Sequence, residues 1–296
     1  MSIEFTAHNI RLDDGTYTKP EVGFGMDAYP VFLSAKGLLT SLFPGDKSRY
    51  RLADLGCLEG GYAVEFARLG FQVLGLEVRD ANFAACRHVQ ANTSLPNLEF
   101  VRDDAWNLAK YGQFDVVFCC GLFYHLDRPK QFLEVLAATT SRVLILQTHF
   151  AVRTRSLISY LPAPLRQFAG TRWRQTSTAK YSLSNLTTHE GLPGRWYSEF
   201  LTDASFRNRE GARWSSWDNR RSFWIQREYL LQAIHDVGFD VVLEQFDSLG
   251  SDIACAMTRG YYNTDSRGTF VGIKSLMTPT AGAEAEPGDA TDPGRR

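Results

Sequence analysis

Residues 51–61 read Arg-Leu-Ala-Asp-Leu-Gly-Cys-Leu-Glu-Gly-Gly, and this stretch decides the fold. Its first five residues are mostly apolar, as in a buried strand, and a turn with three glycines then opens onto a helical pattern at 61–69. Glycine lets the backbone of such a turn approach a ligand, and the first turn of a helix offers N–H groups without intrahelical partners. The stretch therefore predicts a strand, a ligand-binding turn and a helix in succession.

The same alternation continues along the chain as far as residue 147. Helical patterns occupy 80–92 and 129–139, and short apolar runs typical of strands occupy 71–76, 98–102, 114–120 and 142–147. The run at 114–120 is apolar almost throughout, as expected of a strand that is buried on both faces of a parallel sheet. Strands that alternate with helices predict an α/β protein with a doubly wound sheet.

The remaining segments are assigned by their composition and periodicity. Residues 1–50 are expected to form an N-terminal helical cap, with a helix at 29–43. Residues 151–225, rich in Arg and Trp without long apolar runs, predict a lid or partly helical insertion after the fifth strand. Residues 226–260 return to the core with a helix at 226–237 and an antiparallel pair of strands at 240–246 and 253–258. The tail at 278–296 is expected to be disordered.

Composition excludes several classes of protein. Hydrophobic residues make up 44% and charged residues 22% of the 296 residues, as in ordinary globular proteins. No apolar run approaches the roughly 18 residues that a membrane-spanning helix needs, and residues 1–11 lack an apolar signal region, so a cytoplasmic location without membrane contact is expected. The five cysteines are scattered without a zinc-binding spacing, so reduced thiols and no metal site are expected.

Acidic residues stand at or just after three successive predicted strands. Asp54 lies beside the glycine turn, Glu77 follows the second strand, and Asp103 and Asp104 follow the third. A carboxylate in the place of Glu77 can accept hydrogen bonds from both ribose hydroxyls of an adenosine, and one after the third strand can accept from the adenine amino group. Each signal alone is common, but their order predicts an adenosine cofactor. The predicted cofactor-binding residues are Asp54, Gly56, Cys57, Gly60, Glu77, Asp103, Asp104, Ala105 and Gly121.

These residues, together with the run Phe114-Asp-Val-Val-Phe-Cys-Cys-Gly-Leu-Phe-Tyr-His-Leu126, resemble a class I methyltransferase that depends on S-adenosylmethionine (SAM). The resemblance covers 50–150 and 226–259. It implies SAM as cofactor and a Rossmann-like, seven-stranded sheet with an antiparallel last strand. Leu58 departs from the family pattern, because the usual turn has glycine there. The G-x-G-x-x-G spacing of dinucleotide enzymes is absent, which leaves NAD as a minor alternative.

A looser resemblance points to the subgroup that includes the enzyme that carboxymethylates the wobble uridine of tRNA. Its members have Gly-x-x-Tyr-His after the fourth strand, matched by Gly121, Tyr124 and His125, and a late aromatic segment, matched by residues 214–224. Many small-molecule methyltransferases share these features. The resemblance therefore leaves both small molecules and tRNA as acceptors.

Tyr124 and His125 are the predicted catalytic residues, because they follow a strand end where the crevice of an open α/β sheet lies. A general base assists methyl transfer to a hydroxyl, although a histidine bonded to a backbone carbonyl is the structural alternative. Aromatic residues farther along could stack on an acceptor or form the core of the insertion, and arginines could clamp an anion or face solvent. The predicted substrate-binding residues are His149, Trp217, Arg220, Arg221 and Trp224.

Charge favours some acceptors over others. Residues 151–225 carry twelve Lys or Arg residues against five acidic ones, a local charge of +7, whereas the whole chain carries −1. The local excess favours a polar or anionic small-molecule acceptor, methylated at oxygen or nitrogen. Methylation of tRNA, or its carboxymethylation with carboxy-SAM, is the alternative, although tRNA-binding proteins usually show a broader basic surface. A non-catalytic SAM-binding protein is the second alternative.

Overall fold

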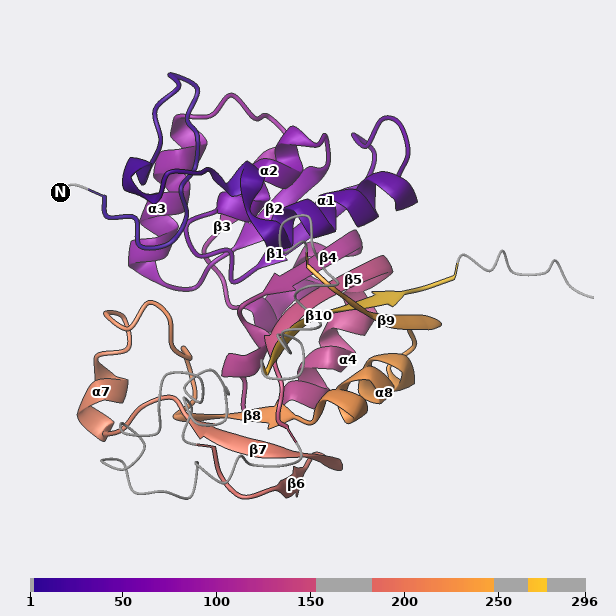
Figure 1. The fold of residues 1–296 in the computed structure, drawn as a ribbon. Helices are drawn as coiled ribbons and strands as arrows, with labels where there is room; N and C mark the ends of the chain where they lie inside the picture. The colour runs from indigo at the N-terminus through magenta and orange to yellow at the C-terminus, as the bar shows by residue number, and fades with distance from the viewer. Residues whose placement is uncertain (1–2, 153–182, 248–265, 276–296) are drawn as a thin grey trace, which may run out of the picture.

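A computed structural model describes residues 3–152, 183–247 and 266–275. A seven-stranded sheet forms the centre, and a smaller three-stranded sheet lies beside it (Figure 1). The strands of the central sheet are β1 (Arg51–Leu55), β2 (Gln72–Leu76), β3 (Leu98–Val101), β4 (Phe114–Cys120), β5 (Thr140–His149), β9 (Val241–Gln245) and β10 (Arg267–Ile273).

The strand order is β3-β2-β1-β4-β5-β10-β9, and the first five strands in this order are parallel. Strand β10 runs antiparallel to both of its neighbours, β5 and β9. The predicted doubly wound sheet with an antiparallel last strand is therefore confirmed.

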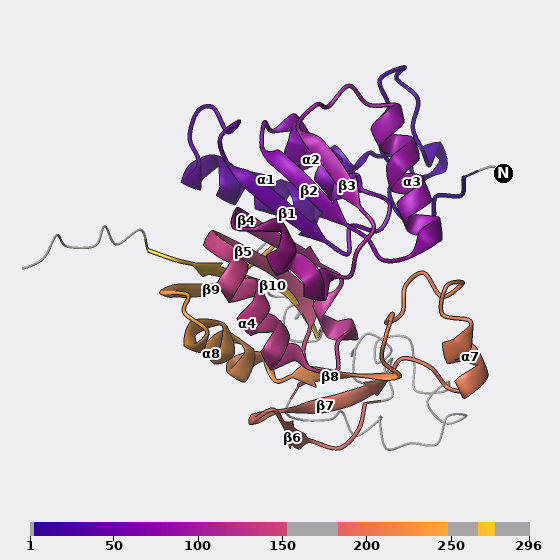
Figure 2. The ribbon, with the colours of Figure 1, turned by 180° about the vertical axis from the view of Figure 1, so that it is seen from behind.

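Helices cover both faces of this sheet (Figure 2). Because successive side chains of a strand point to opposite faces, Leu52 packs into one hydrophobic cluster and its neighbour Ala53 into the other. The first cluster is completed by α1 (Pro30–Leu42), α2 (Gly61–Arg68) and α3 (Asp80–Ala91). The second is completed by α4 (Pro129–Thr139) and α8 (Arg227–Asp236).

The N-terminal segment is held against the turn after β1. The carboxylate of Glu59, fully buried, accepts hydrogen bonds from the backbone N–H groups of Thr6, Ala7 (3.1 Å) and His8 (2.8 Å). Nδ1 of His8 in turn accepts from the N–H of Gly61 at 3.0 Å, and burial lowers the pKa of His8 to about 4. The neutral ring of His8 therefore accepts a hydrogen bond from an N–H group at the start of α2. This contact fixes the N-terminal segment beside the turn.

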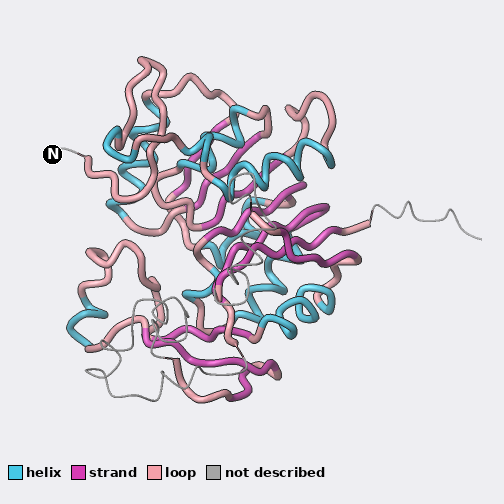
Figure 3. The backbone as a smooth tube through the Cα atoms, in the orientation of Figure 1, coloured by secondary structure: helices cyan, strands magenta, loops and turns pink. Residues whose placement is uncertain are grey.

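The described part of the insertion is mainly β-structure. Strands β6 (Thr187–His189), β7 (Leu192–Ser198) and β8 (Arg221–Ile225) form an antiparallel sheet. Between β7 and β8 the chain forms only one short α-helix, α7 (Asp203–Arg207), and is otherwise loop (Figure 3). The N–H of Phe223 donates to the carbonyl of Leu126 at 2.8 Å, which ties β8 to the core.

The C-terminal strand that completes the sheet lies later than the sequence pattern indicated. The predicted strand at 253–258 and the tail at 278–296 lie outside the described residues. Strand β10 is the antiparallel strand between β5 and β9. Its two glycines made it hard to recognise as a strand in the sequence. A Cβ on Gly272 would lie 2.7 Å from the ring of Phe239, and one on Gly268 would lie 2.9 Å from Glu244 Oε1. Neighbouring side chains fill these places, so β10 lacks the apolar alternation of an ordinary strand. None of the described helices is long and apolar enough to cross a membrane.

Candidate active site

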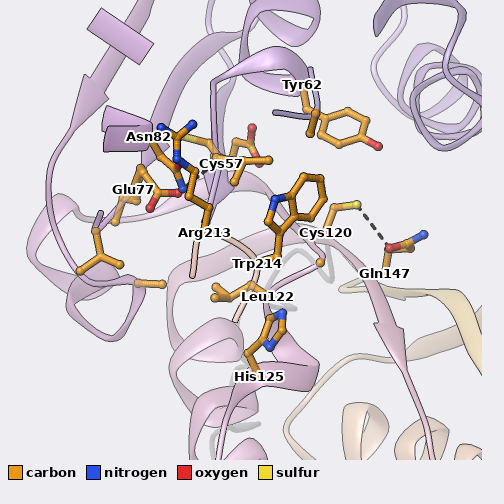
Figure 4. A pocket seen from close by; sticks show the side chains of 18 of the residues that line it. Cys57, Tyr62, Glu77, Asn82, Cys120, Leu122, His125, Gln147, Arg213 and Trp214 are labelled. Carbon is orange, nitrogen blue, oxygen red and sulfur yellow. Dashed lines mark hydrogen bonds between the residues drawn. The ribbon is translucent and has the colours of Figure 1, made fainter. Parts of the chain in front are cut away.

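A cavity of about 790 Å³ opens at the carboxyl ends of β1, β2 and β4 (Figure 4). The N-terminal segment, the loop at 213–218 and the start of β10 also contribute to its wall. The sequence-predicted site residues that line it are Asp54, Gly56, Cys57, Glu77, Asp103, Asp104, Ala105, Gly121, Tyr124, His125 and Trp217. The structure thus brings together most of the predicted cofactor residues and both predicted catalytic residues.

The turn after β1 keeps its sharp bend although Leu58 replaces the usual glycine. The φ angle of Leu58 is 55°, in the left-handed region, which costs a residue with a Cβ about 1–2 kcal/mol. Two contacts hold the strained peptide: its N–H donates to Glu77 Oε2 at 3.0 Å, and its carbonyl accepts from the thiol of Cys86 at 3.2 Å. Gly60, a predicted cofactor-binding residue, lies outside the cavity lining. A Cβ there would collide with the ring of Phe100. Its role is to pack the turn against β3.

Glu77 is fixed at the end of β2 by backbone donors. Its Oε2 accepts from the N–H of Leu58, and its Oε1 accepts from the N–H of Arg79 at 2.8 Å. The residue is 5% exposed, and burial raises the pKa of its carboxyl group. Each carboxylate oxygen has two lone pairs, so both can still accept a hydrogen bond from a ligand.

Asp54 presents a buried carboxylate oxygen that lacks a protein donor. It is 1% exposed, and its Oδ2 has no hydrogen-bond partner among the described residues. Burial raises the pKa of Asp54 to about 8. An orphaned buried polar atom is costly unless a ligand satisfies it, so this wall of the cavity suits a cationic donor.

The residues after β3 divide between structural and ligand-facing roles. Asp103 is engaged by its own loop, since its carboxylate accepts from Asn107 Nδ2 at 2.6 Å and from Tyr111 Oη at 2.8 Å. Asp104 caps the following 3₁₀ helix through the N–H of Trp106 at 3.0 Å. Trp106 also lines the cavity, and its indole Nε1 is a buried donor without a partner in the described part of the chain. The sequence analysis missed Trp106.

His125 is paired with an acid from the insertion. Its Nδ1 lies 2.9 Å from Glu199 Oε1 and 3.0 Å from Oε2. Glu199, which follows β7, also accepts from Ser222 Oγ at 2.8 Å and from the N–H of Ser216 at 3.2 Å. Three donors therefore converge on one carboxylate whose side chain is 2% exposed. Glu199 was not predicted, because nothing in its sequence neighbourhood distinguishes it from other acids.

Four of the five predicted substrate-binding residues lie outside the cavity lining. Arg220 forms a surface ion pair with Asp203, and the guanidinium of Arg221 lies 4.2 Å above the ring of Trp196. The remaining two, His149 and Trp224, stack on each other with ring centroids 4.7 Å apart and an angle of 8°.

Trp224 packs against Tyr124 on the side away from the cavity. It is 1% exposed, and its Nε1 donates to the carbonyl of Tyr124 at 2.9 Å. The ring of His149 also meets Tyr124 edge-on, with centroids 4.6 Å apart. These two residues therefore form packing behind Tyr124, which is the core-forming role that the sequence analysis left open for the aromatic residues.

Arg79 joins the core to the loop at 213–218. Its Nη2 donates to the carbonyls of Ala212 (3.0 Å), Ser215 (2.6 Å) and Ser216 (3.0 Å). Its guanidinium also lies 5.3 Å from the ring of Trp217. The loop is thereby held next to Glu77, with Trp214 placed at the cavity, where it is 60% exposed (Figure 4). Sequence reasoning missed Arg79 because its partners are carbonyls far along the chain.

Comparisons with known proteins agree with this geometry. Residues 52–144 match the family model described as a methyltransferase domain. The fold is similar to the crystal structure of the N-terminal domain of EvdMO1 with S-adenosylhomocysteine (SAH) bound, at 19% identity and a TM-score of 0.60 over 92% of this chain and 93% of that one. The same domain in the presence of SAH and D-fucose gives 21% identity and a TM-score of 0.56 over 85% of each chain. No curated protein matches the chain.

The strand order and the match over residues 52–144 show that the chain has the fold of a methyltransferase domain.

Proposed function

We propose that this chain transfers a methyl group from SAM to a hydroxyl or amino group of a polar small molecule. The observation that carries the proposal is that Asp54, Glu77 and His125 line one cavity. Two of these residues suit a nucleoside cofactor and the third suits proton transfer. A volume of about 790 Å³ is within the range of cofactor and substrate pockets.

The residues present fit the cofactor. Glu77 would accept hydrogen bonds from the ribose hydroxyls, and the orphaned Oδ2 of Asp54 would accept from the cofactor ammonium group. Asp104 would accept from the adenine amino group, with Ala105 and Trp106 beside the ring. When bound, SAM supplies a methyl group that is electrophilic because its sulfur is positively charged.

His125 is placed to remove a proton from the acceptor. Because the carboxylate of Glu199 accepts from Nδ1–H, the neutral ring keeps Nε2 as a base. This nitrogen has no hydrogen-bond partner in the described part of the chain. Nε2 would take the proton that the acceptor oxygen or nitrogen loses on methylation, while SAM would supply the methyl group and be left as SAH. Tyr124, whose ring centroid lies 4.2 Å from that of His125, would orient the acceptor.

Two described arginines of the insertion support a small acceptor over tRNA. Arg220 is neutralised by Asp203 and Arg221 packs on Trp196, both away from the cavity. These two described arginines therefore contribute no basic surface at the cavity, whereas tRNA recognition would favour one.

Calorimetric titration with SAM, SAH, carboxy-SAM and NAD tests the cofactor. Binding of SAM and SAH is the expected result, and binding of NAD alone, or of none of the four, would overturn the proposal. Preference for carboxy-SAM would instead favour carboxymethylation of tRNA. Methyl transfer from labelled SAM to a panel of polar acceptors then tests catalysis. Because a domain of similar fold was crystallised with SAH and D-fucose, monosaccharides belong in that panel. Tight SAM binding without any transfer would favour the non-catalytic alternative.

A further inference from the structure

Four polar side chains from separate elements line the cavity next to Gly121. Tyr124 follows β4, Gln147 lies on β5, Asp247 follows β9 and Arg267 begins β10. We refer to these four residues as the polar cluster. Only Tyr124 was predicted from the sequence, and none of the other three has a role in the cofactor site described above.

Hydrogen bonds join Gln147 and Arg267 within the polar cluster. Nε and Nη2 of Arg267 donate to Gln147 Oε1 at 2.9 and 2.6 Å. The thiol of Cys120 donates to the same oxygen at 3.4 Å (Figure 4). The guanidinium of Arg267 also lies 5.5 Å from the ring centroid of Tyr124, within cation–π range. These contacts hold Gln147 and Arg267 in place before any ligand binds.

Two of these groups lie close to Gly121 at the end of β4. A Cβ on Gly121 would lie 3.7 Å from Arg267 Nη2 and 3.8 Å from Tyr124 Oη. The guanidinium and the phenol thus converge over the residue that borders the predicted cofactor site. A ligand that contacts both would lie beside the cofactor rather than in its place.

The polar cluster is electrically balanced. The carboxylate of Asp247 accepts from Thr269 Oγ1 at 3.0 Å and faces the same cavity as the guanidinium of Arg267. One acid and one base offer both hydrogen-bond acceptors and donors without a net charge. A phosphate or carboxylate ligand would meet Arg267 but would be repelled by Asp247. A hydroxyl, which both donates and accepts, can satisfy the two together.

The same cavity has flat aromatic surfaces. Phe24, Tyr29 and Trp214 line it and remain 47%, 39% and 60% exposed. The rings of Phe24 and Tyr29 lie 6.0 Å apart, and that of Tyr29 lies 6.2 Å from Tyr62. Exposed apolar surface gathered around a concave polar site is typical of ligand binding. The C–H face of a sugar ring is apolar, whereas its rim of hydroxyl groups is polar, so such a ring matches both parts of the wall.

We infer that the polar cluster and these aromatic side chains form an acceptor subsite for a neutral polyhydroxylated ring, with Asp247 and Arg267 binding adjacent hydroxyl groups. The inference rests on the proposed function, because it names the acceptor class of the same cavity. It predicts that a neutral sugar binds beside the cofactor and that a sugar phosphate does not bind better.

The test is saturation-transfer NMR and calorimetry on the full chain saturated with SAH, with D-fucose, galactose 1-phosphate and cyclohexanol as probes. Asp247→Asn and Arg267→Gln are compared with Asp240→Asn and Arg207→Gln, whose parent side chains are exposed and lie outside the cavity lining. We expect D-fucose to bind the parent and both control variants, and to bind each cluster variant at least tenfold more weakly. SAH affinity should be unchanged in all four variants, which also verifies folding.

The outcomes separate the two proposals. If SAH binds but D-fucose binds all variants equally, or if only galactose 1-phosphate binds, the subsite is overturned and the proposed methyl transfer stands. Binding of cyclohexanol as strongly as D-fucose would also overturn it, because no adjacent hydroxyl groups would be needed. Failure of SAH to bind the parent protein would overturn both the proposed function and the subsite that rests on it.

Discussion

Glu199 holds His125 with both oxygens of its carboxylate, which lie 2.9 and 3.0 Å from Nδ1 although the two residues are 74 positions apart. His125 comes from the 3₁₀ helix after β4 and Glu199 from the insertion. The proposed base is therefore assembled between the core and the insertion. Under the proposed function, the insertion would therefore take part in catalysis by holding the base.

Glu199→Gln should lower kcat by about tenfold and His125→Ala by about 10²-fold or more, the range typical of general-base catalysis. SAH affinity should change little, because neither side chain is assigned to the cofactor. Methyl-transfer kinetics measure the loss, and ¹⁵N NMR of His125 should show that the Nδ1–H tautomer is less populated in Glu199→Gln. Glu228→Gln, at an exposed site on α8, is the matched control. Full activity in both active-site variants would exclude His125 as the base.

Glu77→Gln should weaken SAH binding by roughly 10- to 100-fold, because a hydrogen bond to a charged group contributes about 1.5–3 kcal/mol. The amide retains one acceptor oxygen, and thermal unfolding should show whether the turn at Leu58 survives. Calorimetry measures the affinity, with Glu99→Gln on the exposed side of β3 as the control. Unchanged affinity in a folded Glu77→Gln protein would contradict the ribose assignment.

Without cofactor, the ionisation of Asp54 should lower the free energy of unfolding as pH rises. Burial raises the pKa of Asp54 from the ordinary 3.8 to about 8, so between these values the folded state binds a proton that the unfolded state has released. The free energy of unfolding then falls with rising pH by up to about 1.4 kcal/mol per unit across this window. Below the lower value both states are protonated and the penalty disappears.

Urea unfolding of the parent and Asp54→Asn without cofactor, from pH 5 to 8, isolates this effect. The stability of the parent relative to the variant should decrease steadily over the range, since other titrating groups are common to both proteins. Two parallel stability curves would show that Asp54 titrates normally.

Cofactor binding should release a proton from Asp54 at pH 7. The ammonium group of SAM or SAH favours the carboxylate form, whereas the raised pKa of about 8 leaves the free protein mostly protonated there. The binding enthalpy should therefore depend on the ionisation enthalpy of the buffer, and this dependence should vanish in Asp54→Asn. If both proteins show the same buffer dependence, the proton released on binding comes from a group other than Asp54.

Arg79→Lys should loosen the loop at 213–218. Lysine retains the charge but lacks the planar group that contacts three carbonyls, so amide hydrogen exchange in the loop should become faster while β1 and β4 exchange as before. Arg87→Lys, at an exposed site on α3, should exchange like the parent. Equal protection of the loop in all three proteins would show that other contacts hold it.

The local pattern of apolar and polar residues was sufficient to predict the parallel part of the central sheet. The alternation from 51 to 147 predicted five parallel strands because strands buried on both faces are short, apolar and separated by helices. The same positions carried the candidate cofactor site, since residues that end neighbouring parallel strands must meet at one edge of the sheet. Strand β10 escaped prediction because Phe239 and Glu244 occupy the space above its glycines, which a single sequence does not show.

The sequence alone therefore determined the five parallel strands, the glycine turn and the carboxylates that follow these strands, because each depends on periodicity and on order along the chain. Only the tertiary structure decided which distant side chains meet: Glu199 with His125, Arg79 with the carbonyls of the loop, and Arg267 with Gln147. It also placed Arg220, Arg221, His149 and Trp224 outside the cavity lining. The identity of a polar residue does not show which residue it will contact. Hydrogen bonds and ion pairs depend on distances in space, and sequence separation does not specify these distances.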